Sequence, residues 1–278
     1  MPLFTQNTTY FETAMTLKAP SLVNYPLLNF QQQGSGEHLV LIHGLFGSLE
    51  NLNMVAKVLA TDYCVTSVDV RNHGQSFHEN DMAYENLAQD IVNLLDHLTI
   101  GQVNILGHSM GGKIAMELAL TFPQRVKKLI VADIAPVSYP PHHTNIIKGL
   151  RAIDLSQVSK RSDADKQLAP YVDNVSVRQF LLRNLVNINN QYSFKCSLDF
   201  IDRCYGQIMD GYQGDAQFNK PTLFIKGGDS DYIQLSHKAI INKILPLSSV
   251  KIIQGTGHWL HAEKTTAFNK IVSDFLKG

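Results

Sequence analysis

The heptapeptide GHSMGGK, residues 107–113, fits two motifs that predict different folds and different chemistry. As G-x-S-x-G, it is a nucleophile elbow, a sharp strand-to-helix turn that presents the Ser109 hydroxyl. As G-x-x-x-x-G-K, it is most of a phosphate-binding loop in which Lys113 contacts the phosphates. The residues around the heptapeptide therefore decide between a serine nucleophile and a nucleotide site.

The phosphate-loop interpretation fails on chemistry and on position. Such a loop needs Ser or Thr directly after its lysine, because that hydroxyl ligates magnesium, and the residue here is Ile114. Such loops usually follow the first strand of their fold, whereas GHSMGGK follows the third clear parallel run, about a hundred residues into the chain. No convincing acidic partner for magnesium stands at a strand end. Nucleotide binding is therefore the last of the alternatives.

The surroundings of Ser109 favour the elbow. The apolar run VNIL, residues 103–106, precedes it and a helical segment over residues 111–121 follows it, which is the required order of strand, turn and helix. Gly107 and Gly111 avoid side-chain collisions across so tight a turn. The simpler alternative is a glycine-rich loop in which Ser109 only caps the helix. The preceding strand makes that alternative the weaker one.

The rest of the chain alternates between apolar runs and helical segments, which predicts a doubly wound, mostly parallel α/β sheet. The helical segments cover residues 84–98, 111–121 and 264–276. Earlier, residues 22–39 resemble a hairpin with Gly34-Ser35-Gly36 as its turn. The apolar runs are short and β-branched, as expected of buried parallel strands. They are residues 39–42, 63–68, 103–106, 129–132, 222–225 and 250–253.

The alternation stops between about residues 136 and 216, where three prolines in APVSYPPHH open a different kind of segment. We predict a helical cap over residues 136–216, inserted into an α/β core of residues 21–135 and 217–278. Residues 1–20 lack a basic start followed by an apolar stretch, so we predict no signal peptide and an N-terminal extension that is a candidate for disorder. The amphipathic stretches of the cap are residues 144–153, 163–171, 176–186 and 198–209.

Composition narrows the class of partner. Of the 278 residues, 44% are hydrophobic, enough for a buried core, and 24 basic residues balance 24 acidic ones, so no global basic field favours nucleic acid. No run reaches about 18 apolar residues, which predicts no membrane span. Cys64, Cys196 and Cys204 lack C-x-x-C spacing, which argues against a disulfide framework or a zinc site. The simplest location is a reducing one, the cytoplasm.

A serine nucleophile needs a base, and eleven histidines are available. His258 is the best candidate because it lies in GTGHW, in a loop directly after the last strand, from where an imidazole can reach Ser109. Its alternative role is an exposed loop histidine beside a buried Trp259. His261 ranks second, because WLHAEK looks like the start of a helix.

The base in turn needs a carboxylate that holds its tautomer. Asp133 ends one strand in VADIAP, and Asp231 follows another in KGGDSDYI, with Asp229 as a weaker third candidate. Both loops leave the sheet at its carboxyl edge, where sites form. Spacing leaves the choice open, and each Asp that is not used would cap a turn or a helix.

Backbone N–H groups are expected to form the oxyanion hole. Met110, directly after the nucleophile, supplies one, and Leu45 in HGLFGS is our choice for the second, with Phe46 next. The predicted substrate contacts are neighbours of these groups, namely Phe46, His108 and Trp259. None of these roles requires a metal ion or an organic cofactor.

Together, these motifs resemble the α/β-hydrolase fold, and within it the YbfF-type esterases and their abhydrolase-domain relatives in eukaryotes. The resemblance covers roughly residues 21–278, with the cap more loosely covered. It implies a cytoplasmic serine esterase or thioesterase that acts on acyl esters, including acyl-CoA, and that carries a small helical cap. The motifs are HGLFGSLENL, VRNHG, GHSMGGK, VADIAPV and GTGHWLHAEK.

The resemblance also bears on the acid. Members of that group carry it at the match to Asp133 and tend to have no Asp at the match to Asp231. This chain departs from the pattern with GGDSD, so both residues stay candidates. We favour Asp133 and keep Asp231 as the alternative.

The function that we predict is hydrolysis of a carboxylic ester or thioester through an acyl-serine intermediate. The partner would be a small-molecule ester or thioester with a short to medium acyl chain, and the enzyme would be a monomer or homodimer. Three alternatives use the same fold: C–C bond hydrolysis, perhydrolysis without a cofactor, and ligand sensing without turnover.

Overall fold

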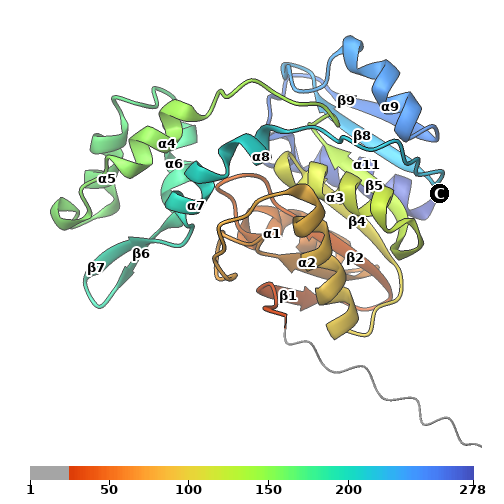
Figure 1. Cartoon of the computed structure of the whole chain (residues 1–278), viewed down its shortest axis with the longest axis horizontal. Coiled ribbons are helices and arrows are strands. Elements are labelled where there is room, and N and C mark those ends of the chain that lie inside the picture. The colour runs from red at the N-terminus through yellow and green to blue at the C-terminus, as the bar shows by residue number, and fades with distance from the viewer. Residues whose placement is uncertain (1–24) are drawn as a thin grey trace, which may run out of the picture.

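The computed structural model describes residues 25–278 and is built on one seven-stranded sheet with the order β1-β3-β2-β4-β5-β8-β9 (Figure 1). All neighbouring pairs are parallel except β1 with β3. The six predicted runs all lie in these strands, which confirms the doubly wound α/β class. The predicted N-terminal extension, residues 1–20, lies outside the described residues. The strands are β1 (Phe30–Gln33), β2 (Glu37–Ile42), β3 (Tyr63–Val68), β4 (Val103–His108), β5 (Val126–Ala132), β8 (Thr222–Gly227) and β9 (Ser248–Ile253).

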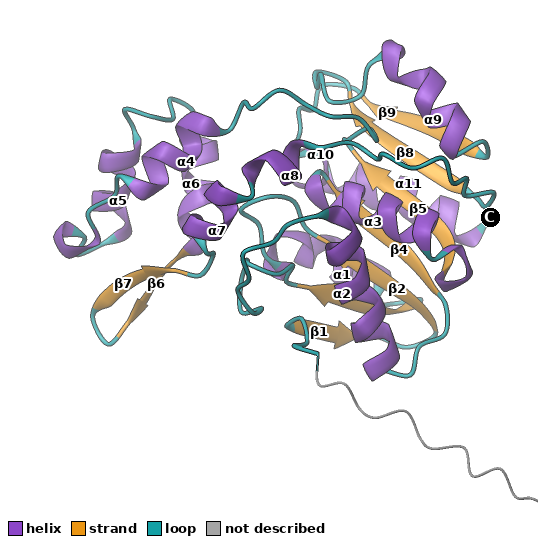
Figure 2. Ribbon diagram, in the orientation of Figure 1, coloured by secondary structure: helices purple, strands orange, loops and turns teal. Residues whose placement is uncertain are grey.

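Alternation along β2 shows that the sheet is covered on both faces. Val40 and Ile42 join a core cluster with helices α2 and α3, whereas Leu39 and Leu41 join a second cluster with α1 and α11. In Figure 2, α2 and α3 lie in front of the sheet and α11 lies behind it. Continuous apolar runs are the pattern that such strands require. The core helices are α1 (Asn53–Leu59), α2 (Tyr84–His97), α3 (Met110–Thr121), α9 (Lys238–Ile244), α10 (Leu260–Glu263) and α11 (Thr265–Lys277).

The predicted hairpin over residues 22–39 is wrong. β1 and β2 pair with opposite edges of β3, so β3 lies between the two strands that the hairpin would join. Gly34 and Gly36, with φ of 79° and 107°, carry the connection past the start of β3. A Cβ atom on Gly34 would lie 2.3 Å from the Tyr63 carbonyl oxygen. The glycines are therefore needed because the turn passes close to another strand.

Between β5 and β8 the chain forms a group of short elements to one side of the sheet (Figure 1). The predicted helix over 176–186 is wrong at its end, because α6 stops at Leu181 and a β6–β7 hairpin follows. Asn189 and Asn190 form the turn at positive φ, which asparagine tolerates. The extent of the predicted cap, residues 136–216, stays a prediction. The elements are α4 (Thr144–Arg151), α5 (Arg161–Leu168), α6 (Val175–Leu181), β6 (Leu185–Ile188), β7 (Gln191–Phe194), α7 (Leu198–Arg203) and α8 (Tyr205–Met209).

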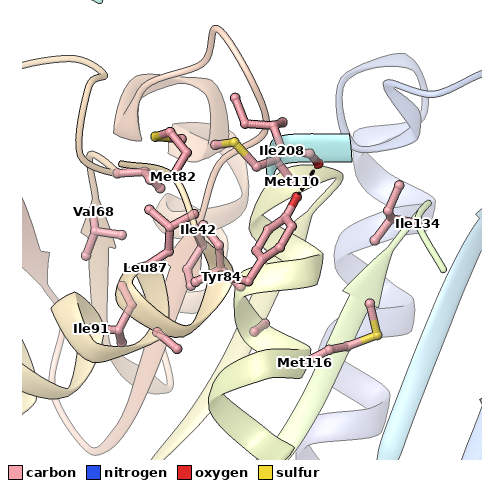
Figure 3. Close-up of a cluster of buried hydrophobic side chains, with 14 of the residues drawn as sticks. Ile42, Val68, Met82, Tyr84, Leu87, Ile91, Met110, Met116, Ile134 and Ile208 are labelled. Carbon is pink, nitrogen blue, oxygen red and sulfur yellow. Dashed lines mark hydrogen bonds between the residues drawn. The ribbon is translucent and has the colours of Figure 1, made fainter. Parts of the chain in front are cut away.

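The end of this inserted segment packs on the core beside α2 and α3. Tyr84, at the start of α2, donates its hydroxyl to the Ile208 carbonyl at 2.7 Å, inside an apolar cluster that includes Met82 and Met110 (Figure 3). The Met82 N–H donates to Gln207 Oε1 at 2.8 Å. These contacts bring α8 next to the helix that begins at the nucleophile elbow.

A buried ion cluster holds the loop between β3 and α2. Arg71 and Asp90 are each 6% exposed, and Arg71 Nε lies 2.6 Å from Asp90 Oδ2. Asp81 and Glu79 complete the cluster at 3.3 and 3.4 Å from Arg71 Nη1. Because charges are costly to bury alone, this arrangement makes Arg71 and Asp90 dependent on one another.

Arg71→Met is expected to lower the free energy of unfolding by about 3–5 kcal/mol, because it leaves the Asp90 carboxylate buried without its partner. The matched control is Lys270→Met, which removes an exposed i,i+4 pair with Asp274. That substitution should change the free energy of unfolding by less than about 0.5 kcal/mol. Urea denaturation followed by circular dichroism measures both, and equal effects would contradict the role of the buried pair.

Candidate active site

Ser109 lies in the tight turn that the elbow motif predicts, between β4 and α3. Its backbone has φ 55° and ψ −122°, and its N–H donates to the Ala132 carbonyl at 2.9 Å. A Cβ atom on Gly107 would lie 2.0 Å from the Gly111 carbonyl oxygen, and one on Gly111 would lie 2.4 Å from the Ile42 carbonyl oxygen. Glycine at both positions therefore lets the strand turn directly into the helix and leaves the serine hydroxyl projecting.

Three loops bring Ser109, His258 and Asp133 together. His258, between β9 and α10, places Nε2 at 2.8 Å from Ser109 Oγ. Its other ring nitrogen, Nδ1, lies 2.7 Å from Asp133 Oδ2. Asp133 follows β5 directly and is 0% exposed. Because the carboxylate accepts the Nδ1–H, the Nε2 lone pair is directed at the serine hydroxyl, which is the geometry of a nucleophile, a base and an orienting acid.

The Asp133 carboxylate has further donors at the end of β8 and in the loop that follows it. Gly227 N–H donates to Oδ1 at 3.0 Å, and the Ser230 hydroxyl donates to Oδ2 beside His258. Sequence analysis missed Ser230, although it stands between the two alternative acids in GGDSD. A lone serine in a polar loop carries no signal until the fold places it against a buried carboxylate.

The alternative acids lie apart from the imidazole. Asp231 and Asp229 are both exposed, and within residues 25–278 neither carboxylate forms a hydrogen bond with His258. The end of β8 and the loop after it therefore contribute a backbone N–H and a hydroxyl to the Asp133 carboxylate. From the sequence alone, the same loop was a candidate source of the acid itself. The geometry favours Asp133 for the orienting role.

An aromatic ring packs on the imidazole. Tyr232 stacks on His258 with ring centroids 3.9 Å apart and an angle of 23° between the planes. Its hydroxyl donates to His142 Nε2 at 2.8 Å, and its backbone carbonyl accepts the Tyr139 hydroxyl at 2.5 Å. Burial raises the pKa of Tyr232 to about 12, so the ring stays neutral. Sequence analysis did not identify this contact, which joins residues far apart in the chain.

Two further histidines lie behind the base. His108 Nε2–H donates to the His258 backbone carbonyl at 2.8 Å, which holds the loop of the base against the elbow. Its ring contacts that of His261 with centroids 4.5 Å apart. Burial, with the neighbouring His261 and His258, holds the pKa of His108 well below its usual range. His261, the second-ranked base, lies against His108 and not at Ser109 Oγ.

The two predicted oxyanion donors are free to donate to a substrate oxygen. Neither the Leu45 N–H nor the Met110 N–H has a hydrogen-bond acceptor within the described part of the chain. Phe46, the alternative to Leu45, donates its N–H to His73 Nε2 at 3.1 Å. That donor is therefore occupied, and Leu45 remains the better choice. Met110 is the first residue of α3, where the N–H groups have no partner in the helix.

A cavity of about 890 Å³ opens over Ser109 and His258. Its walls come from the loop over residues 43–47, residues 257–263 with helix α10, and helix α6 of the inserted segment. The three predicted substrate contacts, Phe46, His108 and Trp259, all line it. The Trp259 ring faces that of Phe180 at 5.7 Å, so core and insertion meet across the cavity. Its apolar walls from the insertion are Ile146, Val177, Phe180 and Leu181.

Lys113 does not point toward a phosphate site. Its Nζ donates to the Met209 carbonyl at 3.2 Å and to the Asp210 carbonyl at 2.5 Å, at the end of α8. Burial lowers its pKa to about 8. Through these two hydrogen bonds, Lys113 connects helix α3 to the end of α8 in the inserted segment.

Two kinds of feature are absent from residues 25–278. No helix among them combines the length and the apolar character needed to cross a bilayer. No group of three or more His, Cys, Asp or Glu side chains in that range is placed to hold a metal ion.

Known proteins share both the sequence and the fold of this chain. A model of the alpha/beta hydrolase fold matches residues 37–169. Esterase YbfF of Escherichia coli is 35% identical over 88% of this chain and 95% of that protein. The chain belongs to the α/β-hydrolase family. The resemblance inferred from the motifs is thereby confirmed.

Two further relatives of this α/β-hydrolase are similar along most of their length. The mouse protein named sn-1-specific diacylglycerol lipase ABHD11 is 39% identical over 86% of this chain and 80% of that protein. A solved structure named as a marine microorganism esterase is 40% identical, with a TM-score of 0.88 over 90% of this chain and all of that one. The fold of this hydrolase therefore extends well beyond the residues that the family model matches.

Asp133→Asn is expected to lower kcat/KM by about a thousandfold or more, because the amide no longer holds the His258 tautomer or stabilises its cation. Asp231→Asn, at an exposed position, should lower it by less than about twofold. Hydrolysis of p-nitrophenyl butyrate measures both variants. A larger loss in Asp231→Asn than in Asp133→Asn would assign the acid to Asp231.

Low pH is expected to destabilise the folded protein through protonation of His261 in the unfolded chain. Burial lowers the pKa of His261 to about 4, below the ordinary value of about 6.5. Between those values the unfolded chain binds a proton that the folded chain does not, so stability falls as the pH drops. When the pH falls from 7 to 4.5, the free energy of unfolding of His261→Phe should therefore decrease by about 1–3 kcal/mol less than that of the wild type. Urea denaturation at both pH values tests this, and an unchanged pH dependence would contradict it.

Proposed function

We propose that the protein is a serine hydrolase of carboxylic esters or thioesters. The observation that carries the proposal is the unbroken hydrogen-bonded series from Ser109 through His258 to Asp133, at 2.8 and 2.7 Å, on the wall of a large cavity. The names of the relatives, esterase and lipase, support the same reaction class. The site contains a nucleophile, a base and free N–H donors, which are the groups that acyl transfer requires.

In the first step, His258 Nε2 accepts the proton of the Ser109 hydroxyl while Oγ attacks the carbonyl carbon of the substrate. The buried Asp133 carboxylate accepts the Nδ1–H and stabilises the imidazolium that forms. Tyr232 lies with its ring face against the same imidazole, a position that favours a cation. The tetrahedral oxygen would accept hydrogen bonds from the Leu45 and Met110 N–H groups.

The intermediate then collapses. The imidazolium gives its proton to the departing alkoxide or thiolate, and the acyl group remains on Ser109 Oγ. In the second half-reaction His258 accepts a proton from water, whose oxygen attacks the acyl carbon, and the acid leaves when the proton returns to Ser109. These steps use only side chains, backbone N–H groups and water.

The cavity supports a small acyl substrate. Ile146, Val177 and Phe180 supply an apolar wall for an acyl chain opposite the nucleophile. Ester and thioester substrates, acyl-CoA among them, pass through the same oxyanion, so this geometry serves both. The cytoplasmic location and the choice between monomer and homodimer stay predictions.

Wild-type protein is expected to hydrolyse p-nitrophenyl butyrate, and Ser109→Ala is expected to retain less than about one part in a thousand of that rate. A fluorophosphonate should add its phosphonyl group to Ser109 of the wild type and not to the variant, as read by peptide mass spectrometry. Butyryl-CoA in a parallel assay separates thioesterase from esterase activity. Equal rates in wild type and Ser109→Ala would overturn the proposal, and an inert wild type would direct the search to C–C hydrolysis or ligand sensing.

A further inference from the structure

The predicted oxyanion donor lies in a loop whose peptide units are held one after another. The first unit joins Gly44 to Leu45. Because a trans peptide is planar, the Gly44 carbonyl and the Leu45 N–H point in opposite directions, so fixing one fixes the other. The Gly44 oxygen accepts His43 Nδ1–H at 2.8 Å and Gly47 N–H at 2.9 Å. The Leu45 N–H therefore points away from these two donors, in a loop whose residues 43–47 all line the cavity.

The second unit joins Leu45 to Phe46, and a buried histidine holds it. Phe46 N–H donates to His73 Nε2 at 3.1 Å, while His73 Nδ1–H donates to the Arg71 carbonyl at 2.9 Å. The two contacts define a neutral imidazole with its lone pair on Nε2. Burial and the neighbouring His43 lower the pKa of His73 to about 3, so it remains an acceptor at neutral pH.

The third unit joins Phe46 to Gly47, and the residue that holds it comes from the inserted segment. The Phe46 carbonyl accepts Asn184 Nδ2–H at 2.6 Å. The same amide nitrogen donates to the Leu181 carbonyl at 3.1 Å. The backbone carbonyl of Asn184 accepts Lys195 N–H at 2.8 Å. Both acceptors of the amide are carbonyl oxygens, so its orientation is unambiguous. Asn184 is 4% exposed, so water does not substitute for it.

Phe46 needs this support because its backbone is in an unfavourable conformation. Its φ is 59°, the left-handed region that residues with a side chain rarely adopt. Its N–H and its carbonyl are each held by one buried side chain, His73 from the core and Asn184 from the insertion. Without the Asn184 contact, φ of Phe46 would relax and rotate the Leu45–Phe46 peptide unit. That rotation would in turn move the Leu45 N–H away from the oxygen of the substrate.

We propose that Asn184 is a positioning residue of the oxyanion hole, so that the inserted segment completes the catalytic machinery as well as forming a wall of the cavity. It acts through Phe46 on the Leu45 N–H and does not touch the substrate. This inference rests on the proposed ester hydrolysis, because the oxyanion that these donors would meet forms when Ser109 attacks the substrate carbonyl.

A second hydrogen bond between insertion and core provides the matched control. Gln207 Oε1 accepts the Met82 N–H at 2.8 Å, just before α2, and within the described residues neither partner forms a hydrogen bond with residues 43–47. A general loosening of the insertion would follow from loss of either contact. An effect on the oxyanion hole would follow from loss of Asn184 alone.

The test compares Asn184→Leu, which keeps the number and branching of the side-chain heavy atoms and removes the donor, with Gln207→Ala and wild type. Steady-state hydrolysis of p-nitrophenyl butyrate and the affinity for an alkyl trifluoromethyl ketone are measured, together with thermal midpoints. In Asn184→Leu we expect kcat to fall by about tenfold to a hundredfold with KM changed less than about twofold, since the donor acts on the transition state. Affinity for the ketone, which forms an oxyanion on the serine, should fall by the same factor. Gln207→Ala should keep the wild-type kcat.

His73→Leu supplies a second variant that leaves the insertion intact, and the same loss of kcat is expected from it. The inference is overturned if Asn184→Leu or His73→Leu keeps the wild-type kcat, or if Asn184→Leu and Gln207→Ala lose activity equally. It is also overturned if Asn184→Leu raises KM and leaves kcat unchanged. Failure of the proposed function gives a different result, namely a wild type no faster than Ser109→Ala.

Discussion

The left-handed backbone of Ser109 is the constraint around which the site is arranged. A residue with a side chain held in such a conformation costs about 1–3 kcal/mol, so the surrounding structure must impose it. β4 runs straight into α3, Gly107 and Gly111 remove the side chains that would collide, and the Ala132 carbonyl holds the Ser109 N–H. The same geometry that strains the serine lifts its hydroxyl toward His258 and places the Met110 N–H beside it.

Neutral imidazoles hold much of the remaining framework. His43, His73 and His108 are buried; His43 and His73 each join a backbone N–H to a backbone carbonyl, and His108 donates to the His258 carbonyl. An uncharged imidazole has one donor and one acceptor on a rigid ring, so a histidine can join an N–H to a carbonyl across a fixed distance. Burial lowers the pKa of all three, which preserves this pattern at neutral pH. His258 differs from these three because it has the Asp133 carboxylate at Nδ1 and Ser109 Oγ at Nε2, the contacts that the proposed base requires.

How far the site was predictable depends on whether its residues lie close in the chain. Ser109 and Met110 are neighbours in one turn, so a short motif identifies them. Asp133 and Asp231 follow different strands, and their loops look alike in sequence. The fold separates them, because the Asp133 carboxylate lies buried against Gly227, Ser230 and His258, while Asp231 is exposed. Asn184 and Tyr232 carried no signal, because their contacts join segments that only the folded chain brings together.

By itself, the sequence determined the six parallel strands of the sheet, three of the helices that cover it, and the elbow with its serine. These are local properties, since a strand covered on both faces must be apolar along its length and a tight turn must contain glycine. Only the tertiary structure decided that β1 pairs with β3, that a β-hairpin ends the predicted helix over 176–186, and which carboxylate meets the imidazole. Those outcomes depend on contacts between residues that are distant in the chain. Hydrogen-bond geometry and burial select among such contacts, and the spacing of residues along the chain reveals neither of them.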